Sequence, residues 1–148
     1  MTDSGILEEL STVSRDPDPL LRSLAALTLG FFPLDLADQS LTVLLADADS
    51  STRANAAVAF ARHKSLKAVP VLRDVLKTAA GQKQAGPSGD VAPIAATNAM
   101  KAIGELAASL DAVTRSEIVT DVTTISTDFP DPRVRLDAAQ TLMKLKSK

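Results

Sequence analysis

The stretch DPDPLLRSLAALTLG at residues 16–30 decides the fold class of this 148-residue chain. It opens with aspartates, whose carboxylates accept hydrogen bonds from the unpaired backbone N–H groups of a helix start. Pro19 fits the first helical position, where its missing N–H loses no partner. Ala and Leu, which favour helices, fill most of the remaining positions. The stretch therefore predicts a capped, largely apolar helix.

The same pattern returns three times along the chain. Each copy carries a small-residue pair followed by a large apolar residue, and the positions equivalent to Arg22 are Arg53, Ala96 and Arg135. These positions are 31, 43 and 39 residues apart, within the period range of solenoids built from helical hairpins. The copies are DADSSTRANAAVAFA at 47–61, DVAPIAATNAMKAIG at 90–104 and PDPRVRLDAAQTL at 130–142.

A second apolar-periodic stretch precedes each copy, so the chain reads as four helix pairs. We therefore predict an all-α fold, an α-solenoid of about eight helices that forms a single domain over residues 1–148. The preceding stretches cover residues 6–13, 34–46, 66–80 and 114–126. The four predicted repeats cover about 4–30, 34–62, 65–108 and 112–146.

The segment IVTDVTTIST at 118–127 is rich in β-branched residues, which favour strands. Its apolar residues Ile118, Val122 and Ile125 nevertheless follow the i, i+4, i+7 spacing of a helix. Just before it, Thr114 and Glu117 fit a capping box, in which both side chains bind N–H groups of the first turn. We predict a helix here, beginning at Thr114.

The second stretch of each pair resembles the HEAT and HEAT-like repeats, including the variety first associated with phycobilin lyases. The resemblance implies an α-solenoid that serves as a non-catalytic protein-binding scaffold or adaptor. An alternative within the resemblance is a lyase or maturation factor that holds a cofactor-bearing client protein. The second repeat departs from the pattern at Thr52, and the third lacks the arginine. The matching residues are Asp18, Leu21, Arg22, Ala25, Ala26, Leu29 and Gly30, then Asp131, Val134, Arg135, Ala138, Ala139 and Leu142.

The resemblance also implies a structural ladder in which each arginine reaches the aspartate of a neighbouring repeat turn. Three repeats keep both partners, whereas Ala96 interrupts the ladder in the third. The small residues Ala26, Ala57 and Ala139 are expected at tight helix contacts. The predicted ladder residues are Asp18, Arg22, Asp49, Arg53, Asp131 and Arg135.

The residues needed for common catalytic chemistries are scarce. The sequence has no Cys and one His, so we expect no thiolate or paired-histidine metal site, no cofactor and no enzyme activity. His63 lies between Arg62 and Lys64, where neighbouring cations disfavour a bound metal, and we interpret it as a solvated surface residue. Neither a P-loop nor a dinucleotide-binding glycine motif occurs.

The charge pattern favours a protein partner. The formal net charge of −2 gives no surplus of cations for nucleic acid, and no apolar run approaches the length of a membrane span. Residues 1–50 carry −7, and residues 51–101 carry +6. The basic segment could serve an acidic partner or be a solvated face, and the contrast suits a homo-oligomer associating head to tail through the first repeat. Residues 1–10 carry Asp3, Glu8 and Glu9 where a signal peptide would be basic and then apolar, so we expect a cytoplasmic protein.

A row of residues lies opposite the core face when the second helix of each pair is drawn at 100° per residue. We predict that this row lines a concave protein-binding face. Its members in the first repeat are all apolar, so they form an interface or, through the Phe31-Phe32-Pro33 turn, plug the junction between repeats. The row comprises Leu20, Leu24, Leu27, Phe31, Asn55, Val58, Arg62, Asn98, Lys101, Asp137, Gln140 and Lys144.

The longest repeat contains a glycine-rich insertion at 81–90. It is either an arm that closes over a ligand or a tolerated surface insertion, since long loops cost little closure entropy.

Overall fold

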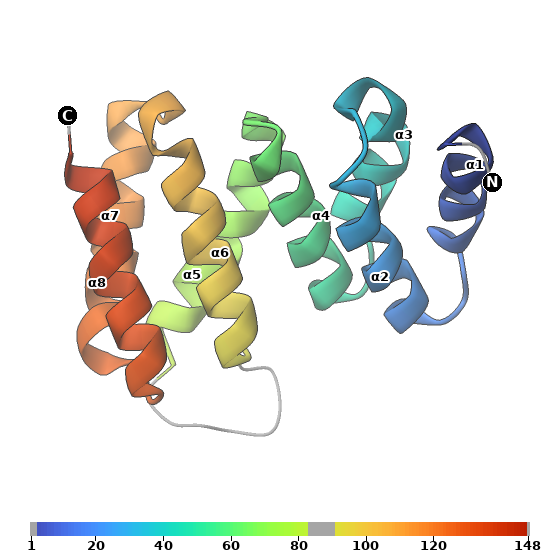
Figure 1. Ribbon diagram of the computed structural model, residues 1–148. Helices are drawn as coiled ribbons and strands as arrows, with labels where there is room; N and C mark the ends of the chain where they lie inside the picture. Colours follow the sequence, from blue (N-terminus) through green and yellow to red (C-terminus); the bar gives the residue numbers. More distant parts are fainter. Residues whose placement is uncertain (1–2, 83–90, 148) are drawn as a thin grey trace. The chain divides into compact units, whose positions relative to one another are not determined.

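A computed structural model describes residues 3–82 and 91–147 of the chain. Within these residues the backbone forms eight α-helices and two short 3-10 helices, and no strand (Figure 1). The prediction of an all-α fold with eight helices is confirmed, whereas residues 83–90 of the predicted insertion lie outside the described residues. The helices are α1 Asp3–Val13, α2 Pro19–Leu29, α3 Leu34–Leu45, α4 Ser50–Arg62, η1 Leu66–Ala68, α5 Val69–Ala80, α6 Pro93–Leu106, η2 Ala107–Ser109, α7 Ala112–Asp128 and α8 Pro132–Lys146.

The chain divides into two compact units, and the first covers Met1–Val71. In this unit α2 packs against α4, α1 packs against α2 and α3, and α3 also packs against α4 (Figure 1). The largest buried side chains of the unit are those of Leu29, Leu41, Leu44 and Phe60. The two helix pairs α1–α2 and α3–α4 therefore share an apolar core.

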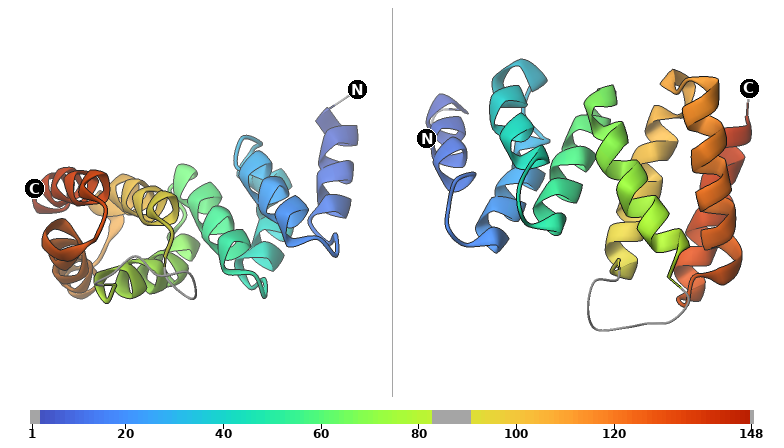
Figure 2. Two further views of the ribbon diagram at one scale, coloured as in Figure 1. Left: turned by 90° about the horizontal axis from the view of Figure 1, so that it is seen from below. Right: turned by 180° about the vertical axis from the view of Figure 1, so that it is seen from behind.

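The second unit covers Leu72–Lys148. Here α8 packs against both α6 and α7, and the view from behind shows α7 in front of α8 (Figure 2). An ion pair between Arg73 and Glu117 joins α5 to α7. Met100, Ile103 and Ile125 are buried in the core of this unit. The single-domain organisation of the whole chain stays a prediction.

The second helix of each pair, α2, α4, α6 and α8, is called an inner helix. Aspartates cap α2, α4 and α8 as the sequence predicts, whereas the N-cap of α6 is Ala92, which forms no side-chain hydrogen bond there. The Asp18 carboxylate accepts a hydrogen bond from the backbone N–H of Leu20 at 2.8 Å. Asp49 accepts from the N–H of Thr52 at 2.7 Å, and Asp131 from that of Arg133 at 2.8 Å. Prolines occupy the first positions of α2, α6 and α8, where a backbone N–H would have no acceptor within the helix.

Helix α7 forms despite its β-branched residues, but it begins two residues earlier than predicted. Asp111 is its N-cap and accepts from the N–H of Thr114 at 2.9 Å, so the capping box with Thr114 at its start is wrong. The threonine hydroxyls donate to carbonyl oxygens three or four residues earlier, which satisfies them within the helix. These threonines are Thr120, Thr123, Thr124 and Thr127.

Two of the three alanines that were predicted at tight helix contacts are buried, and the third is exposed. Ala26 and Ala57 are fully buried, whereas Ala139 is exposed and its neighbour Ala138 is buried. The expectation for Ala139 is wrong because it lies on a side of α8 that no helix of the described residues covers.

Candidate functional site

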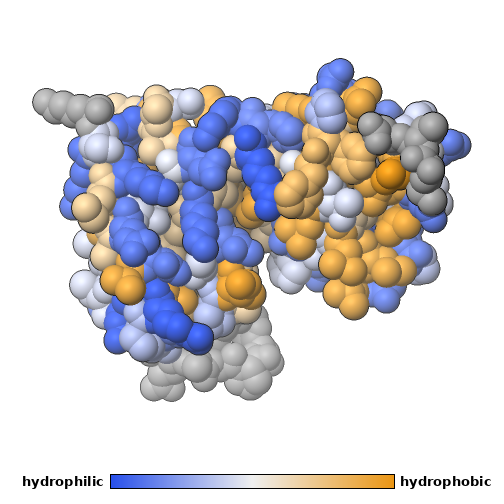
Figure 3. All heavy atoms as spheres, in the orientation of Figure 1, coloured by the Kyte–Doolittle hydropathy of each residue, from blue (hydrophilic) through white to orange (hydrophobic). Residues whose placement is uncertain are grey.

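The apolar row of α2, which continues to Phe31 in the turn after the helix, lies on the surface of the first unit. Leu20, Leu24 and Phe31 are 63%, 50% and 76% exposed, and Leu27 is half-buried. Figure 3 shows apolar side chains gathered over α2. The opposite face of the helix carries buried Ala25, Ala26 and Leu29. The core therefore accounts for one face of α2 only, and Phe31 does not plug a junction.

An arginine on α4 accompanies the aromatic end of this row. The guanidinium carbon of Arg62 lies 4.3 Å from the centre of the Phe31 ring, a cation–π contact between two members of the predicted row. Arg62 is exposed. The contact gives the first unit a surface with both an aromatic ring and a positive charge.

Two polar members of the predicted row are engaged between neighbouring helices. The side-chain amide of Asn55 donates to the hydroxyl of Ser23 at 2.7 Å, within the first unit. In the second unit, the hydroxyl of Thr97 donates to the carboxylate of Asp137 at 2.9 Å. A helical wheel places these residues beside the open face but gives no information about the neighbouring helix that they meet.

The remaining row members vary in exposure. Val58 and Asn98 are half-buried, and the exposed members are Lys101, Gln140 and Lys144. The row members on α2 and α4 belong to the first unit, and those on α6 and α8 belong to the second. That all of them line one concave binding face stays a prediction.

The recurring arginines bind the turns that precede their own helices. Arg22 donates to the carbonyl oxygen of Asp16 at 2.8 Å, and Arg53 to that of Asp47 at 2.7 Å. Arg135 donates to the carbonyl oxygen of Phe129 at 2.7 Å. Each arginine also donates to the next carbonyl along the turn, so the same device repeats in three places. This role was not predicted, although the fixed spacing of six residues between each arginine and the first carbonyl could have indicated it.

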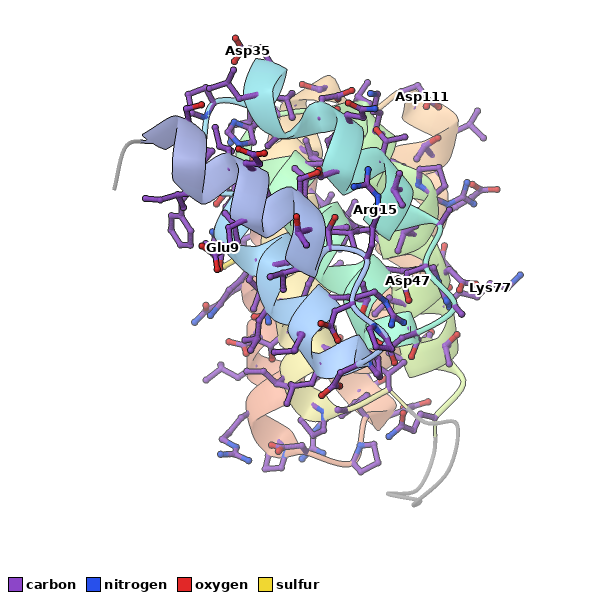
Figure 4. The ribbon with its side chains drawn as sticks, turned by 90° about the vertical axis from the view of Figure 1, so that its right-hand side faces the viewer. Glu9, Arg15, Asp35, Asp47, Lys77 and Asp111 are labelled. Carbon is purple, nitrogen blue, oxygen red and sulfur yellow. The ribbon has the colours of Figure 1, made fainter. Side chains whose placement is uncertain are left out.

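Arg22 makes a further contact, with the turn that begins the next inner helix. Its Nε and Nη2 atoms donate to the two carboxylate oxygens of Asp47 at 2.7 Å and 2.9 Å. The hydrogen bonds from Arg22 lower the pKa of Asp47 below its ordinary value. Figure 4 shows Asp47 in the turn between α3 and α4. Arginine and aspartate are thus paired between two consecutive repeats.

The predicted partners in the ladder need correction. Asp18, Asp49 and Asp131 cap helices, and the aspartate that receives Arg22 is Asp47, two residues before Asp49. Asp131 also pairs with Arg133 at 2.8 Å. The side-chain and backbone hydrogen bonds from Arg133 lower the pKa of Asp131 to about 2. Asp47 and Asp49 lie in one turn, and the sequence does not indicate which of them caps the helix and which pairs with the arginine.

His63 is not a fully solvated residue. Its Nε2 atom is buried and has no hydrogen-bond partner among the described residues, and the side chain as a whole is half-buried. Lys64 adopts a left-handed backbone with φ of 57°, and the N–H of Ser65 then bonds to the carbonyl of Phe60 at 3.0 Å. This tight end of α4 turns the chain back beside His63.

Two further observations concern metals and membranes. In the part of the chain that the structure describes, no group of three or more His, Asp or Glu side chains is arranged to hold a metal ion. Among residues 3–82 and 91–147, no helix has both the length and the apolar character needed to cross a membrane.

The comparisons with known proteins agree with the repeated helix pairs. A family model described as HEAT repeats matches residues 4–85, which is more than half of the chain. The chain therefore belongs to the HEAT repeat family, whose repeats generally mediate protein interactions and scaffolding. No curated protein matches the sequence. The phycobilin-lyase variety of the repeat stays a prediction.

Proposed function

We propose that this protein is a non-catalytic protein-binding scaffold or adaptor, and that the apolar row of α2 receives its partner. The observation that carries the proposal is the exposure of Leu20 and Leu24 on one side of α2 and of Phe31 in the turn that follows it. Burial of one such side chain is worth about 1.5–3 kcal/mol, so a partner that covers the row gains substantial free energy. A cytoplasmic location belongs to the proposal.

The surface chemistry favours a particular kind of partner. Leucines and a phenylalanine suit aliphatic or aromatic side chains on the facing protein, and Arg62 suits a carboxylate beside them. Arginine and aromatic residues are enriched where binding energy concentrates at protein interfaces. The partner surface is therefore expected to combine an apolar ridge with one acidic residue.

The hydrogen bonds of Asn55 and Asp137 support a scaffold over the alternative of a lyase or maturation factor. That alternative requires Asn55, Asn98 and Asp137 of the row to converge on a closed small-molecule pocket. Asn55 instead donates to Ser23, and Asp137 accepts from Thr97. These groups stabilise the contacts between helices, which leaves the apolar residues as the main binding feature of the row.

A capture experiment tests the proposal. The tagged wild-type chain, a Leu20→Asp/Phe31→Asp variant and a Leu36→Asp control are used to capture proteins from native lysate. Leu36 is an exposed leucine on α3 and lies outside the row. We expect proteins enriched by the wild type and the control to be lost with the double variant. Equal capture by all three chains would overturn the assignment of the row as the binding surface.

A further inference from the structure

Leu20 and Phe31 mark the two ends of the exposed row of α2. The equivalent positions of the other inner helices are exposed as well, even on α4 and α8, which each pack against an inner helix that precedes them. They are Ser51 and Arg62 on α4, Ile94 and Glu105 on α6, and Arg133 and Lys144 on α8. Exposure of these two positions is therefore a property of this face of the repeat, and only the first repeat has apolar residues at both.

The row has the width of one helix. Its residues 20, 24, 27 and 31 follow a 4-3-4 spacing, so they form a single stripe that extends for about three turns, or roughly 16 Å. Beside the stripe, the Asn55 amide donates to the hydroxyl of Ser23 at 2.7 Å. A partner that covers this pair therefore leaves its hydrogen bond intact. A helix with apolar residues at a matching spacing can pack along such a stripe.

The two ends of the row differ in charge. At the Leu20 end, the exposed Asp18 begins α2 and accepts a hydrogen bond from the N–H of Leu20 at 2.8 Å. At the other end, the guanidinium carbon of Arg62 lies 4.3 Å from the centre of the Phe31 ring. Stacking uses the flat face of a guanidinium, whereas a carboxylate binds its N–H edge, so one arginine can do both. The row therefore extends from a negative end to a positive end.

We propose, on the basis of the proposed function, that the row binds a single amphipathic α-helix of a partner protein, antiparallel to α2. The apolar side of the partner helix covers Leu20, Leu24 and Phe31. An acidic residue in its first turn faces Arg62, and a basic residue in its last turn faces Asp18.

Electrostatics determine this direction. Acidic residues stabilise the first turn of a helix and basic residues the last, because the backbone dipoles leave partial positive charge at the start and partial negative charge at the end. A partner helix with this common charge order meets both Arg62 and Asp18 favourably only if its start lies at the Phe31 end, where α2 finishes. The dipoles of the two helices are then opposed, which adds to the attraction.

Two synthetic peptides of about 18 residues, each labelled with a dye, probe the row. Both carry leucines at the 4-3-4 spacing on an alanine background. The acid-first peptide has glutamates in its first turn and lysines in its last turn, and the base-first peptide has these residues exchanged. Fluorescence anisotropy measures the dissociation constant of each peptide with the full chain, up to about 1 mM.

We expect the acid-first peptide to bind the wild type and to lose binding to the Leu20→Asp/Phe31→Asp variant. Arg62→Glu should weaken the acid-first peptide about fivefold and strengthen the base-first peptide by a similar factor, as expected for exposed charge pairs. Asp18→Asn keeps a capping side chain and should weaken the acid-first peptide about threefold. Arg15→Glu, at an exposed arginine outside the row, is the matched control and should leave both affinities unchanged.

A photoreactive group on the acid-first peptide tests the direction of binding. Trypsin cleaves after Arg22 and so separates Leu20 from the later members of the row. We expect a group at the first peptide residue to crosslink within residues 23–62. A group at the last peptide residue should crosslink within residues 16–22.

Several outcomes would overturn the inference. They are no binding of either peptide, equal effects of Arg62→Glu on both peptides, no effect of Asp18→Asn, or crosslinks in the reverse order. Circular dichroism melts verify that each variant is folded, and Arg62→Gln replaces Arg62→Glu if the latter unfolds. If one of these outcomes occurs while capture from lysate still depends on Leu20 and Phe31, the proposed function stands and only the partner helix is wrong. Failure of the two proposals is therefore distinguishable.

Discussion

Arg22 holds the carboxylate of Asp47 through two parallel hydrogen bonds, from Nε at 2.7 Å and from Nη2 at 2.9 Å. The same guanidinium donates to the carbonyl oxygens of Asp16 and Pro17 in its own turn. One side chain thus ties together the turns that begin α2 and α4. A planar group with several donors in a fixed fork is needed for this, and lysine cannot supply it.

Arg22→Lys should therefore lower the melting temperature by several degrees although it keeps the charge. An ammonium group cannot bind both carboxylate oxygens and two carbonyls at once. Arg15→Lys is the matched control, because Arg15 is an exposed arginine just after α1 whose side chain donates to the carbonyl oxygen of Ser11 in the last turn of that helix. Thermal unfolding followed by circular dichroism makes the comparison. Equal melting of both variants would show that the paired hydrogen bonds add no stability.

Lowering the pH should remove the contribution of the Asp131 carboxylate to the stability of the folded chain. Its pKa falls from 3.8 to about 2 in the folded chain because Arg133 donates to it through the side chain and the backbone. The unfolded chain then binds more protons than the folded chain in this interval. The stabilisation is present above about pH 4 and is lost as the pH falls through 2. Urea unfolding should show Asp131→Asn less stable than the wild type at pH 6 and similar to it near pH 2. A constant difference between the two would contradict the role of the carboxylate.

Two glycines at equivalent positions should respond differently to alanine. A Cβ at Gly30 would lie 2.9 Å from the Cβ and 3.1 Å from the Cα of Ala59, so the backbones must separate. We expect Gly30→Ala to cost about 1–3 kcal/mol of unfolding free energy. A Cβ at Gly104 would meet the side chain of Lys144, with its Cδ at 3.1 Å and its Nζ at 3.9 Å, and that side chain can move. Gly104→Ala should be neutral or stabilise by up to about 1 kcal/mol, because alanine favours the helix. Denaturant titrations of both variants check the contrast, which equal effects would refute.

Enlarging the predicted tight alanines should separate buried from exposed positions. Ala26→Leu and Ala57→Leu should each cost about 1–3 kcal/mol, because both residues are fully buried between helices. Ala139→Leu should be neutral in the monomer because Ala139 is exposed. The three variants are compared by urea unfolding in dilute solution. A large loss for Ala139→Leu would mean that this side of α8 is internal.

The helices were predictable because their signals are local. Asp18 with Pro19 begins α2, and the spacing of Ile118, Val122 and Ile125 overcomes the β-branched composition of α7. What depended on neighbouring elements was not predictable. Ala138 and Ala139 are adjacent in one repeated motif, yet only the helix packed beside them determines which is buried.

In the candidate site, too, features set by one helix could be predicted and features set by a neighbouring helix could not. The angular spacing of Leu20 and Leu24 was enough to predict one apolar side of α2, since it depends on a single helix, whereas Phe31 lies in the turn after that helix. The same spacing could not reveal that Asn55 and Asp137 bind neighbouring helices, because these partners lie 32 and 40 residues away in the sequence. The buried Nε2 of His63 likewise depends on a turn whose left-handed residue is a lysine, with no glycine to signal it.

Thermal unfolding of a Leu20→Asp/Leu24→Lys variant in dilute solution tests most directly whether the exposed row of α2 is a binding surface and no part of the core. We expect a single transition with a melting temperature within about 2 °C of the wild type, because substitutions at exposed positions change stability little. A drop of about 10 °C or more would contradict the claim. Such a drop corresponds to several kcal/mol for a chain of this size, the cost of burying two unpaired charges.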